Sequence, residues 1–149
     1  MPAKRLKKRS VANSASPKPL EEQLTFFLDR QLGRHKMAGI LRAAGLQVEV
    51  HDDHLPQNAT DPEWLTLAGK NGWIVVTRDE RIRYRVAEKQ AIRRAKVRAF
   101  VIVAHGDLRI EEIAEILLKA LSKVESIAVQ EKPPFIAKIW RDGNVAVAR

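Results

Sequence analysis

Short, almost continuous apolar segments recur along this chain and are separated by longer amphipathic ones. They predict five strands, at 24–28 (LTFFL), 47–51 (QVEVH), 73–77 (WIVVT), 98–104 (RAFVIVA) and 135–140 (FIAKIW). Mostly apolar strands are typical of parallel sheets, which α/β proteins cover with helices on both sides. Asp142-Gly143 is typical of a tight turn, so the following VAVA is expected to pair back as an edge strand.

The segments between the strands have helical periodicity. Helices are predicted at 34–44, 62–72 and 110–124, and a basic helix or helical loop at 80–95. In the first helix Met37, Ile40, Leu41 and Ala44 share one face, and Gly45 is well placed to end it. Strands that alternate with helices in this way predict an α/β fold with a parallel sheet covered on both faces.

The composition narrows the class of protein. The 149 residues suit a single domain with one core. The net charge of +9, from 27 Lys+Arg against 18 Asp+Glu, favours anionic partners, chiefly nucleic acid or acidic lipid. The chain has no Cys, which excludes disulfides and thiolate sites and fits a cytoplasmic location. No apolar run approaches the roughly 18–20 residues that cross a bilayer, so no membrane span is expected.

The first 20 residues differ from the rest of the chain. They carry six basic residues and no acidic ones, they are rich in Ser, Pro and Lys, and they have no hydrophobic period. We therefore predict a disordered basic tail at 1–20 and one folded domain at 21–149. A nucleic-acid-binding arm and a passive overhang fit this composition equally well.

Carboxylates follow the ends of the first three predicted strands. Asp29 follows the first, Asp52 and Asp53 the second, and Asp79 and Glu80 the third. Ligands of open α/β sheets bind beyond the carboxyl ends of the strands, so neighbouring strands would bring these acids together. Converging carboxylates repel one another unless a hard cation or an arginine lies between them. Oxygen ligands without Cys favour Mg²⁺ or Mn²⁺ over zinc.

Some acids also have a structural interpretation. Asp61 is a candidate N-cap of the helix at 62–72, and Glu63 would complement the dipole of that helix. Thr77 and Glu80 have the spacing of a capping box, so Glu80 is expected to serve the start of the next helix. Asp29 and Asp79 directly follow apolar strands, where an unpaired charge is costly, so these two are the stronger functional candidates.

The histidines, arginines and tryptophans give weaker indications of function than the acids do. His51 and His54 flank the acidic pair after the second strand, and a loop or supporting role is expected over a metal role. Residues 78–98 hold nine Lys+Arg against three acids, which favours contact with phosphate. The candidate phosphate contacts are Arg30, Arg78, Arg81 and Arg83. The three tryptophans, Trp64, Trp73 and Trp140, are expected to pack in the core.

Three segments together resemble a known family. FFLDRQLG, QVEVHDD and TDPEWLTLAGKNGWIVVTRDERIRYR are similar to the PIN-like ribonuclease superfamily, in the branch of short PIN-like proteins that includes VapC-type toxins of toxin–antitoxin pairs. The most specific part is an acid at the head of a helix, here Asp61, followed by a strand that ends in T-x-D, here at Asp79. The resemblance extends over about residues 24–104 and is looser beyond them.

This resemblance implies a Rossmann-like three-layer α/β/α sandwich with a central parallel sheet, and a Mg²⁺- or Mn²⁺-dependent endoribonuclease. The acids that match the catalytic positions are Asp29, Asp61 and Asp79, and the implied metal ligands are these three with Asp53, for which Asp52 is the alternative. The substrate-binding candidates are Arg30, Thr77, Arg78, Arg81 and Arg83. Members of this branch often have a further acid and a Phe after T-x-D, whereas this chain has Glu80-Arg81-Ile82, so a metal role for Glu80 is not carried over.

The resemblance also implies partners. RNA is the expected substrate, a homodimer is suggested, and a toxin would have a small protein antitoxin. An alternative is a non-catalytic module of the same fold, which binds RNA or docks a partner through the basic residues. A phosphoacceptor domain of receiver type fits less well, because Asp29 is alone after its strand and Lys138 lies inside the last one.

Overall fold

The computed structural model describes residues 24–32 and 34–148. The strands are β1 (Thr25–Leu28), β2 (Gln47–Val50), β3 (Ile74–Thr77), β4 (Arg98–Val103), β5 (Phe135–Trp140) and β6 (Val145–Ala148). The α-helices are α1 (Arg34–Ala43), α2 (Asp61–Lys70), α3 (Val86–Ala95) and α4 (Ile110–Gln130), and the short 3₁₀ turns are η2 (Arg30–Leu32), η3 (His51–Asp53) and η4 (Glu80–Arg83). The predicted tail at 1–20 lies outside the described residues. None of the described helices is long and apolar enough to span a bilayer.

The six strands form one sheet in the order β2-β1-β3-β4-β5-β6. The first five are parallel, and β6 pairs antiparallel with β5, as predicted from the Asp142-Gly143 turn and the VAVA segment. Gly143 has φ +89° in this turn, a conformation that glycine adopts without strain. The chain adds β2 on one side of β1 and then β3 on the other. The strand order therefore reverses at β1, and ligands of open α/β sheets bind at such a reversal.

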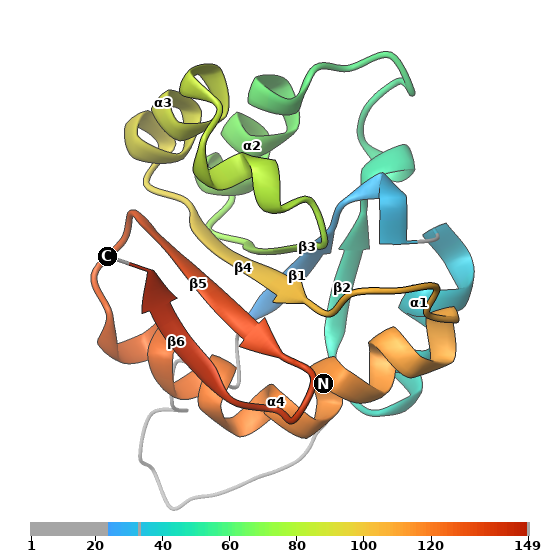
Figure 1. The fold of residues 1–149 in the computed structure, drawn as a ribbon. Coiled ribbons are helices and arrows are strands. Elements are labelled where there is room, and N and C mark those ends of the chain that lie inside the picture. The colour runs from blue at the N-terminus through green and yellow to red at the C-terminus, as the bar shows by residue number, and fades with distance from the viewer. Residues whose placement is uncertain (1–23, 33, 149) are drawn as a thin grey trace, which may run out of the picture.

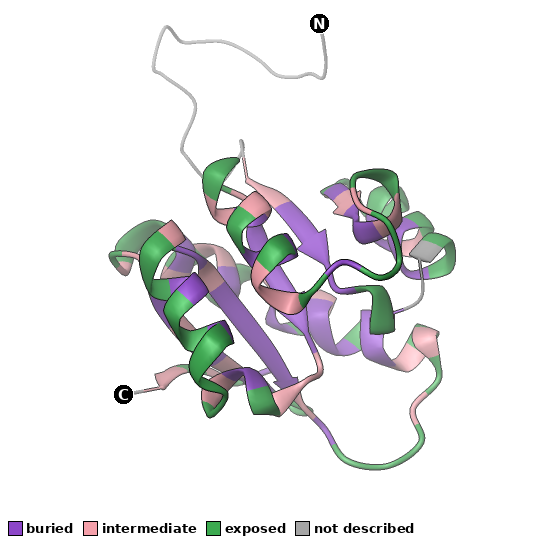
Figure 2. Ribbon diagram, turned by 90° about the horizontal axis from the view of Figure 1, so that it is seen from above, coloured by how far each residue is buried: buried purple, intermediate pink, exposed green. Residues whose placement is uncertain are grey.

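Helices cover the sheet in two separate layers, with α1 and α4 on one face and α2 and α3 on the other (Figure 1). The alternation of side chains along β1 explains both cores. Phe26 and Leu28 join the core beneath α1 and α4, whereas Phe27 joins the core beneath α2 and α3. Buried strands therefore lie between helices with exposed outer faces (Figure 2). The predicted three-layer α/β/α architecture is confirmed.

All four α-helices differ from their predicted boundaries. α2 begins and ends earlier than the predicted 62–72, and the segment predicted at 80–95 contains η4 and then α3, which begins at Val86. α1 ends at Ala43, so Ala44 is exposed and is not part of the buried face as predicted. Gly45, with φ +96°, follows that end as expected, because the left-handed conformation stops the helix. α4 is longer than predicted and runs to Gln130. Its additional turns bury Ala128 against the sheet, which is a tertiary contact that local periodicity does not indicate.

Two of the three tryptophans pack in the core as predicted. Trp64 is buried and stacks on Phe27 with 5.9 Å between ring centroids, and Trp73 stacks on the same ring at 5.4 Å. For Trp140 the prediction is wrong, since 37% of this residue is exposed. Trp140 lies on the face of β5 opposite the side chains that pack beneath α4, and its ring contacts the ammonium group of Lys138.

A glycine lets α2 and α3 pack closely side by side. A Cβ added at Gly69 would lie only 2.5 Å from the Cβ of Ala95, and it would also overlap the Ala95 carbonyl group. The two helices run in the same direction, so their N-terminal ends meet as well. There, Arg85 Nη1 lies 3.7 Å from Asp61 Oδ2. This packing therefore sets the position of Asp61 relative to the start of α3.

The close approach predicts opposite effects of alanine at two helical glycines. Gly69→Ala is expected to lower the free energy of unfolding by about 1–3 kcal/mol, because backbone atoms must move to admit the methyl group. Gly39→Ala in α1 is the matched control, since its Cβ would meet nothing within 4 Å. It is expected to raise the free energy of unfolding by about 0.5–1 kcal/mol. Urea unfolding followed by circular dichroism measures both, and equal effects would contradict the packing.

Candidate active site

Asp29 lies at the carboxyl end of β1, next to the point where the strand order reverses. Its backbone N–H donates to the carbonyl of Val76 in β3 (3.1 Å), and only 6% of the residue is exposed. The Thr77 hydroxyl donates to Asp29 Oδ2 (2.7 Å), and the Gln31 N–H lies 3.3 Å from Oδ1. The carboxylate is therefore buried with its oxygens held by the end of β3 and by η2.

The pKa of Asp29 shows which charges surround it. Burial raises the pKa above its ordinary value, although the hydrogen bonds from Thr77 and Gln31 act in the opposite direction. The negative charges of Asp61 and Asp79 raise it further. Asp61 and Asp79 thus lie close enough to act on the charge of Asp29, and the three acids come from the ends of β1 and β3 and the start of α2.

Thr77 connects two of these acids. Its buried hydroxyl donates to Asp29 and accepts a hydrogen bond from the backbone N–H of Asp79 (3.0 Å). The predicted capping box of Thr77 and Glu80 does not form, because the Thr77 hydroxyl already serves these two aspartates. Asp79 is the N-cap of η4 instead, and its Oδ1 accepts from the Arg81 N–H at 3.0 Å.

Arg81 also neutralises Asp79. Its Nε donates to Asp79 Oδ1 at 2.9 Å. Partial burial by itself raises the pKa of Asp79, but the hydrogen bonds from Arg81 and the charges of Arg81 and Arg85 outweigh it. The pKa of Asp79 therefore lies below its ordinary value, and this carboxylate is ionised at neutral pH.

Asp61 is not the N-cap of α2. Thr60 takes that position and forms a capping box with Glu63, in which the Thr60 side chain accepts from the Glu63 N–H and the Thr60 N–H donates to Glu63 Oε1. Asp61 is thereby released from capping. Its Oδ1 accepts a hydrogen bond from the indole N–H of Trp64 (2.9 Å), which orients the other oxygen, Oδ2, toward Arg85.

Glu88 is an acid that the sequence analysis did not select. It lies in the first turn of α3 with 6% of the residue exposed, and its Oε2 is 3.3 Å from Nη1 of Arg85. The same nitrogen faces Asp61, so Arg85 bridges the two carboxylates. The signal was the spacing of Arg85 and Glu88, which is that of a helical ion pair inside a strongly basic segment.

The acids after β2 are arranged differently. Asp53 is exposed on η3, which follows the edge strand β2. Asp52 is half buried and pairs with Nδ1 of His51 at 3.2 Å, whereas His54 pairs with Glu49 at 2.6 Å. The Nε2 of His51 is buried without a hydrogen-bond partner among the described residues. The histidines thus contact acids outside the group formed by Asp29, Asp61 and Asp79.

Most of the predicted phosphate contacts are engaged within the chain. Arg30 donates to the carbonyl of Gln57, Arg78 donates to the carbonyl of Ala104 (2.5 Å), and Arg81 holds Asp79. Arg83 makes a hydrogen bond to the hydroxyl of exposed Tyr84 (3.1 Å) and lies over its ring. The described contacts of Arg30, Arg78 and Arg81 are to a carboxylate or a backbone carbonyl. Those of Arg83 are to the Tyr84 side chain alone.

The donor chemistry of the site suits a hard divalent cation, since it offers only carboxylate oxygens. Within residues 24–32 and 34–148, however, no three His, Asp or Glu side chains come close enough to form a ready-made metal site. Ion pairs lie among these acids instead, since Arg81 holds Asp79 and Arg85 lies between Asp61 and Glu88. The arginines provide the positive charge that converging carboxylates require.

Comparison with known proteins identifies the family of this chain. Residues 24–104 match the family model described as "PIN like domain". The chain belongs to the PIN-like domain family. It is also similar to a Mycobacterium tuberculosis (strain H37Rv) protein named "Putative ribonuclease VapC45", with 27% identity over 114 residues that span 74% of this chain and 81% of the relative. No solved structure matches the chain. The matched segment contains Asp29, Asp61, Asp79 and Glu88, so the whole acidic group belongs to the PIN-like region.

Removing the Thr77 hydroxyl tests the connection between Asp29 and Asp79. Thr77→Val is expected to lower the free energy of unfolding by about 1–3 kcal/mol, because it leaves a buried carboxylate oxygen and the Asp79 N–H without partners. Thr77→Ser keeps the hydroxyl and is the matched control, with a smaller loss expected. Chemical denaturation at neutral pH measures both variants. A valine variant as stable as the serine variant would show that the hydroxyl is not needed.

The raised pKa of Asp29 predicts a gain of stability when its charge is removed. The Asp29 carboxyl loses its proton at a lower pH in the unfolded state than in the folded state. The free energy of unfolding therefore falls as pH rises from the ordinary pKa of Asp to the raised pKa of the folded state. Above the folded pKa the cost of the buried charge is complete. Asp29→Asn is therefore expected to be more stable than wild type at pH 7 in EDTA, and to lose this advantage in acid. Denaturation series across pH measure it, and a pH-independent difference would contradict it.

Proposed function

We propose that this protein is an endoribonuclease that depends on Mg²⁺ or Mn²⁺ and acts as the toxin of a type II toxin–antitoxin pair. The observation that carries the proposal is the buried carboxylate of Asp29 at the point where the strand order reverses, with the charges of Asp61 and Asp79 acting on it. Membership of the PIN-like family supports nuclease chemistry. The name of the mycobacterial relative supports both RNA cleavage and the toxin role.

In this proposal Asp29, Asp61 and Asp79 hold the metal ion, with Asp53 and Glu88 as further candidate ligands. A bound Mg²⁺ or Mn²⁺ supplies Lewis acidity toward a phosphoryl oxygen and a water of lowered pKa. The protein contributes the placement of the acids. Thr77 fixes the Asp29 carboxylate, and burial excludes bulk water from that oxygen pair.

The arginines at the site have a second role in the same proposal. Arg81 and Arg85 are paired with acids, at 2.9 Å from Asp79 and 3.7 Å from Asp61. With a cation held by the acids, these guanidinium groups would be free to face the substrate. Planar guanidinium groups pair well with phosphate, so they would hold the phosphodiester and stabilise the charge that develops during cleavage.

Two further partners belong to this proposal. A small antitoxin would bind the protein and suppress its activity, and two copies of the chain would pair as a homodimer. A short open reading frame beside the gene would be the simplest sign of an antitoxin. Light scattering coupled to size-exclusion chromatography measures whether the chain forms a homodimer.

One observation favours an alternative, in which the protein binds RNA or docks a partner without cleaving. The acids are already neutralised by Arg81 and Arg85, and the described residues contain no ready-made metal site. A binding module would show salt-sensitive RNA binding that ignores EDTA and tolerates loss of the acids.

Cleavage of RNA separates the two functions. Wild-type protein with Mg²⁺ or Mn²⁺ is expected to cut single-stranded RNA, and Asp29→Asn and Asp79→Asn are expected to lose about 100-fold or more of the rate, on the scale of removing one electrostatic catalytic group. Glu115→Gln, an exposed acid on α4, is the matched control and should retain activity. Equal rates for all four proteins, or no cleavage across metals and RNAs, would refute the nuclease proposal.

A further inference from the structure

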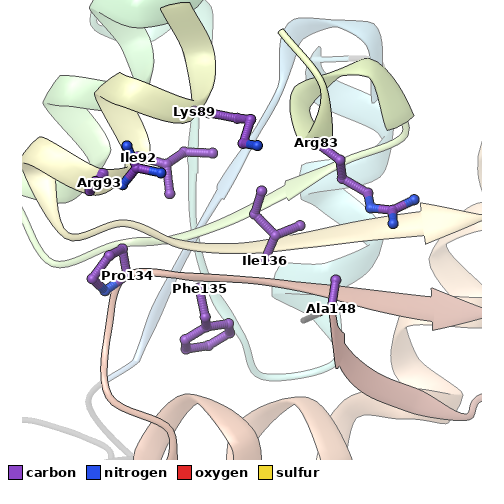
Figure 3. Close-up of a pocket in the computed structure, with 8 residues that line it drawn as sticks. All are labelled: Arg83, Lys89, Ile92, Arg93, Pro134, Phe135, Ile136 and Ala148. Carbon is purple, nitrogen blue, oxygen red and sulfur yellow. The ribbon is translucent and has the colours of Figure 1, made fainter. Parts of the chain in front are cut away.

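A basic groove lies between α3 and the sheet (Figure 3). None of Asp29, Asp61 and Asp79 lines it. It is open to solvent and has a volume of about 280 Å³. Its apolar floor includes Ile92 of α3 and Ile136 of β5, and three cations line it, namely Arg83, Lys89 and Arg93. Among the described residues that line this basic groove, none is acidic.

The cations of the basic groove are available for an outside ligand. Lys89 and Arg93 are exposed, and neither they nor Arg83 form an ion pair with any acid in the described part of the chain. This contrasts with Arg81 and Arg85, whose guanidinium groups face Asp79 and Asp61. The structure therefore separates cations that serve the protein's own acids from cations that carry uncompensated charge.

The basic groove runs from Arg83 toward the amino end of β5, where Pro134 and Phe135 line it. Arg83 ends η4, the 3₁₀ turn that Asp79 caps, so it lies at the edge of the sheet where the acids gather. Lys89 and Arg93 follow along α3, one helical turn apart, and therefore project from the same face of that helix. In Figure 3, Arg83 and Arg93 lie toward opposite ends of the groove, with Lys89 between them and Ile136 below.

The apolar floor is open because α2 and α3 do not cover the whole sheet. Their core contains side chains of β1, β3 and β4, whereas Ile136 of β5 is only partly buried at its margin. Ala148 of the antiparallel edge strand closes the groove beside Ile136, with which it is paired. An apolar surface flanked by cations suits a chain that carries both flat hydrophobic groups and regularly spaced negative charges. Single-stranded nucleic acid has this chemistry.

We propose that the basic groove binds the backbone of single-stranded RNA next to the phosphodiester held at the acids, and that Lys89 and Arg93 contact its phosphates. The proposal rests on the RNA substrate proposed above and extends its path along α3. An acidic protein segment is the competing occupant. RNA is favoured because Arg83 joins the groove to the acidic site, so one strand can pass from the acids over Arg83 to Lys89 and Arg93.

Salt-dependent binding of a fluorescent oligouridylate of about 20 nucleotides, long enough for a typical single-strand site, tests the basic groove. The full chain is used in EDTA, so that binding is measured without turnover. The variant is Lys89→Gln with Arg93→Gln. The matched control is Lys119→Gln with Lys123→Gln, two exposed lysines one helical turn apart on α4, which covers the other face of the sheet. Fluorescence anisotropy gives the dissociation constant at each salt concentration.

The expected result follows from counterion release. Each phosphate contact with a single strand contributes about 0.7 to the slope of log K against log salt, so the groove variant should lose about 1.4 from the slope. The ratio of its dissociation constant to that of wild type should then fall about sevenfold between roughly 50 and 200 mM salt. The α4 control should keep the wild-type slope. The exchange variant, Lys89→Arg with Arg93→Lys, should keep it too, because the charges remain.

Several outcomes would overturn the groove proposal. They are equal slopes for the groove variant and wild type, equal losses in the groove and α4 variants, or no RNA binding by wild-type protein. Displacement of the RNA by polyglutamate at equal charge concentration, with both ligands weakened by the groove variant, would assign the groove to an acidic protein segment instead. The nuclease proposal can fail while the groove proposal stands. A protein that never cuts RNA but shows the groove-dependent slope would retain the binding site and lose only the nuclease function.

Discussion

The arrangement of the candidate active site depends on one buried carboxylate, that of Asp29. A charge with so little access to water must have hydrogen-bond donors, and the Thr77 hydroxyl and the Gln31 N–H provide them. The Thr77 hydroxyl also accepts from the Asp79 N–H, so one side chain sets the positions of two acids on adjacent strands. The negative charges that gather here then require positive partners, which the segment after β3 supplies.

Five cations of that segment, residues 78–94, have one of two roles. Arg81 and Arg85 turn toward Asp79 and Asp61, and their positive charges offset the repulsion among the carboxylates. Arg83, Lys89 and Arg93 line the basic groove instead. The physical reason lies in the two structures that the segment adopts, the η4 turn and then α3, which present successive basic residues to different neighbours.

Sequence reasoning identified the acids better than it identified their partners. The positions of Asp29 and Asp79 after apolar strands were sufficient to predict that they meet, because parallel strands end at the same edge. Asp61 was harder to interpret, since its place before Pro62 fits a helix cap. In the structure Thr60 caps α2 instead, and Asp61 is left to face Arg85. Glu88 was not selected, because its burial beside α2 is invisible in a segment whose local composition is basic.

The sequence by itself determined the elements, the parallel sheet and the edge at which the acids would collect, because apolar periodicity and strand ends are local patterns with few alternative solutions. Family resemblance carried by the same residues agreed with these patterns, and the PIN-like match confirms it. Only the tertiary structure decided which arginine pairs with which acid, why Trp140 is exposed, and where uncompensated positive charge remains. Those outcomes depend on long side chains that can reach several partners. The packing of α2 and α3 over only part of the sheet decides which partner each side chain meets.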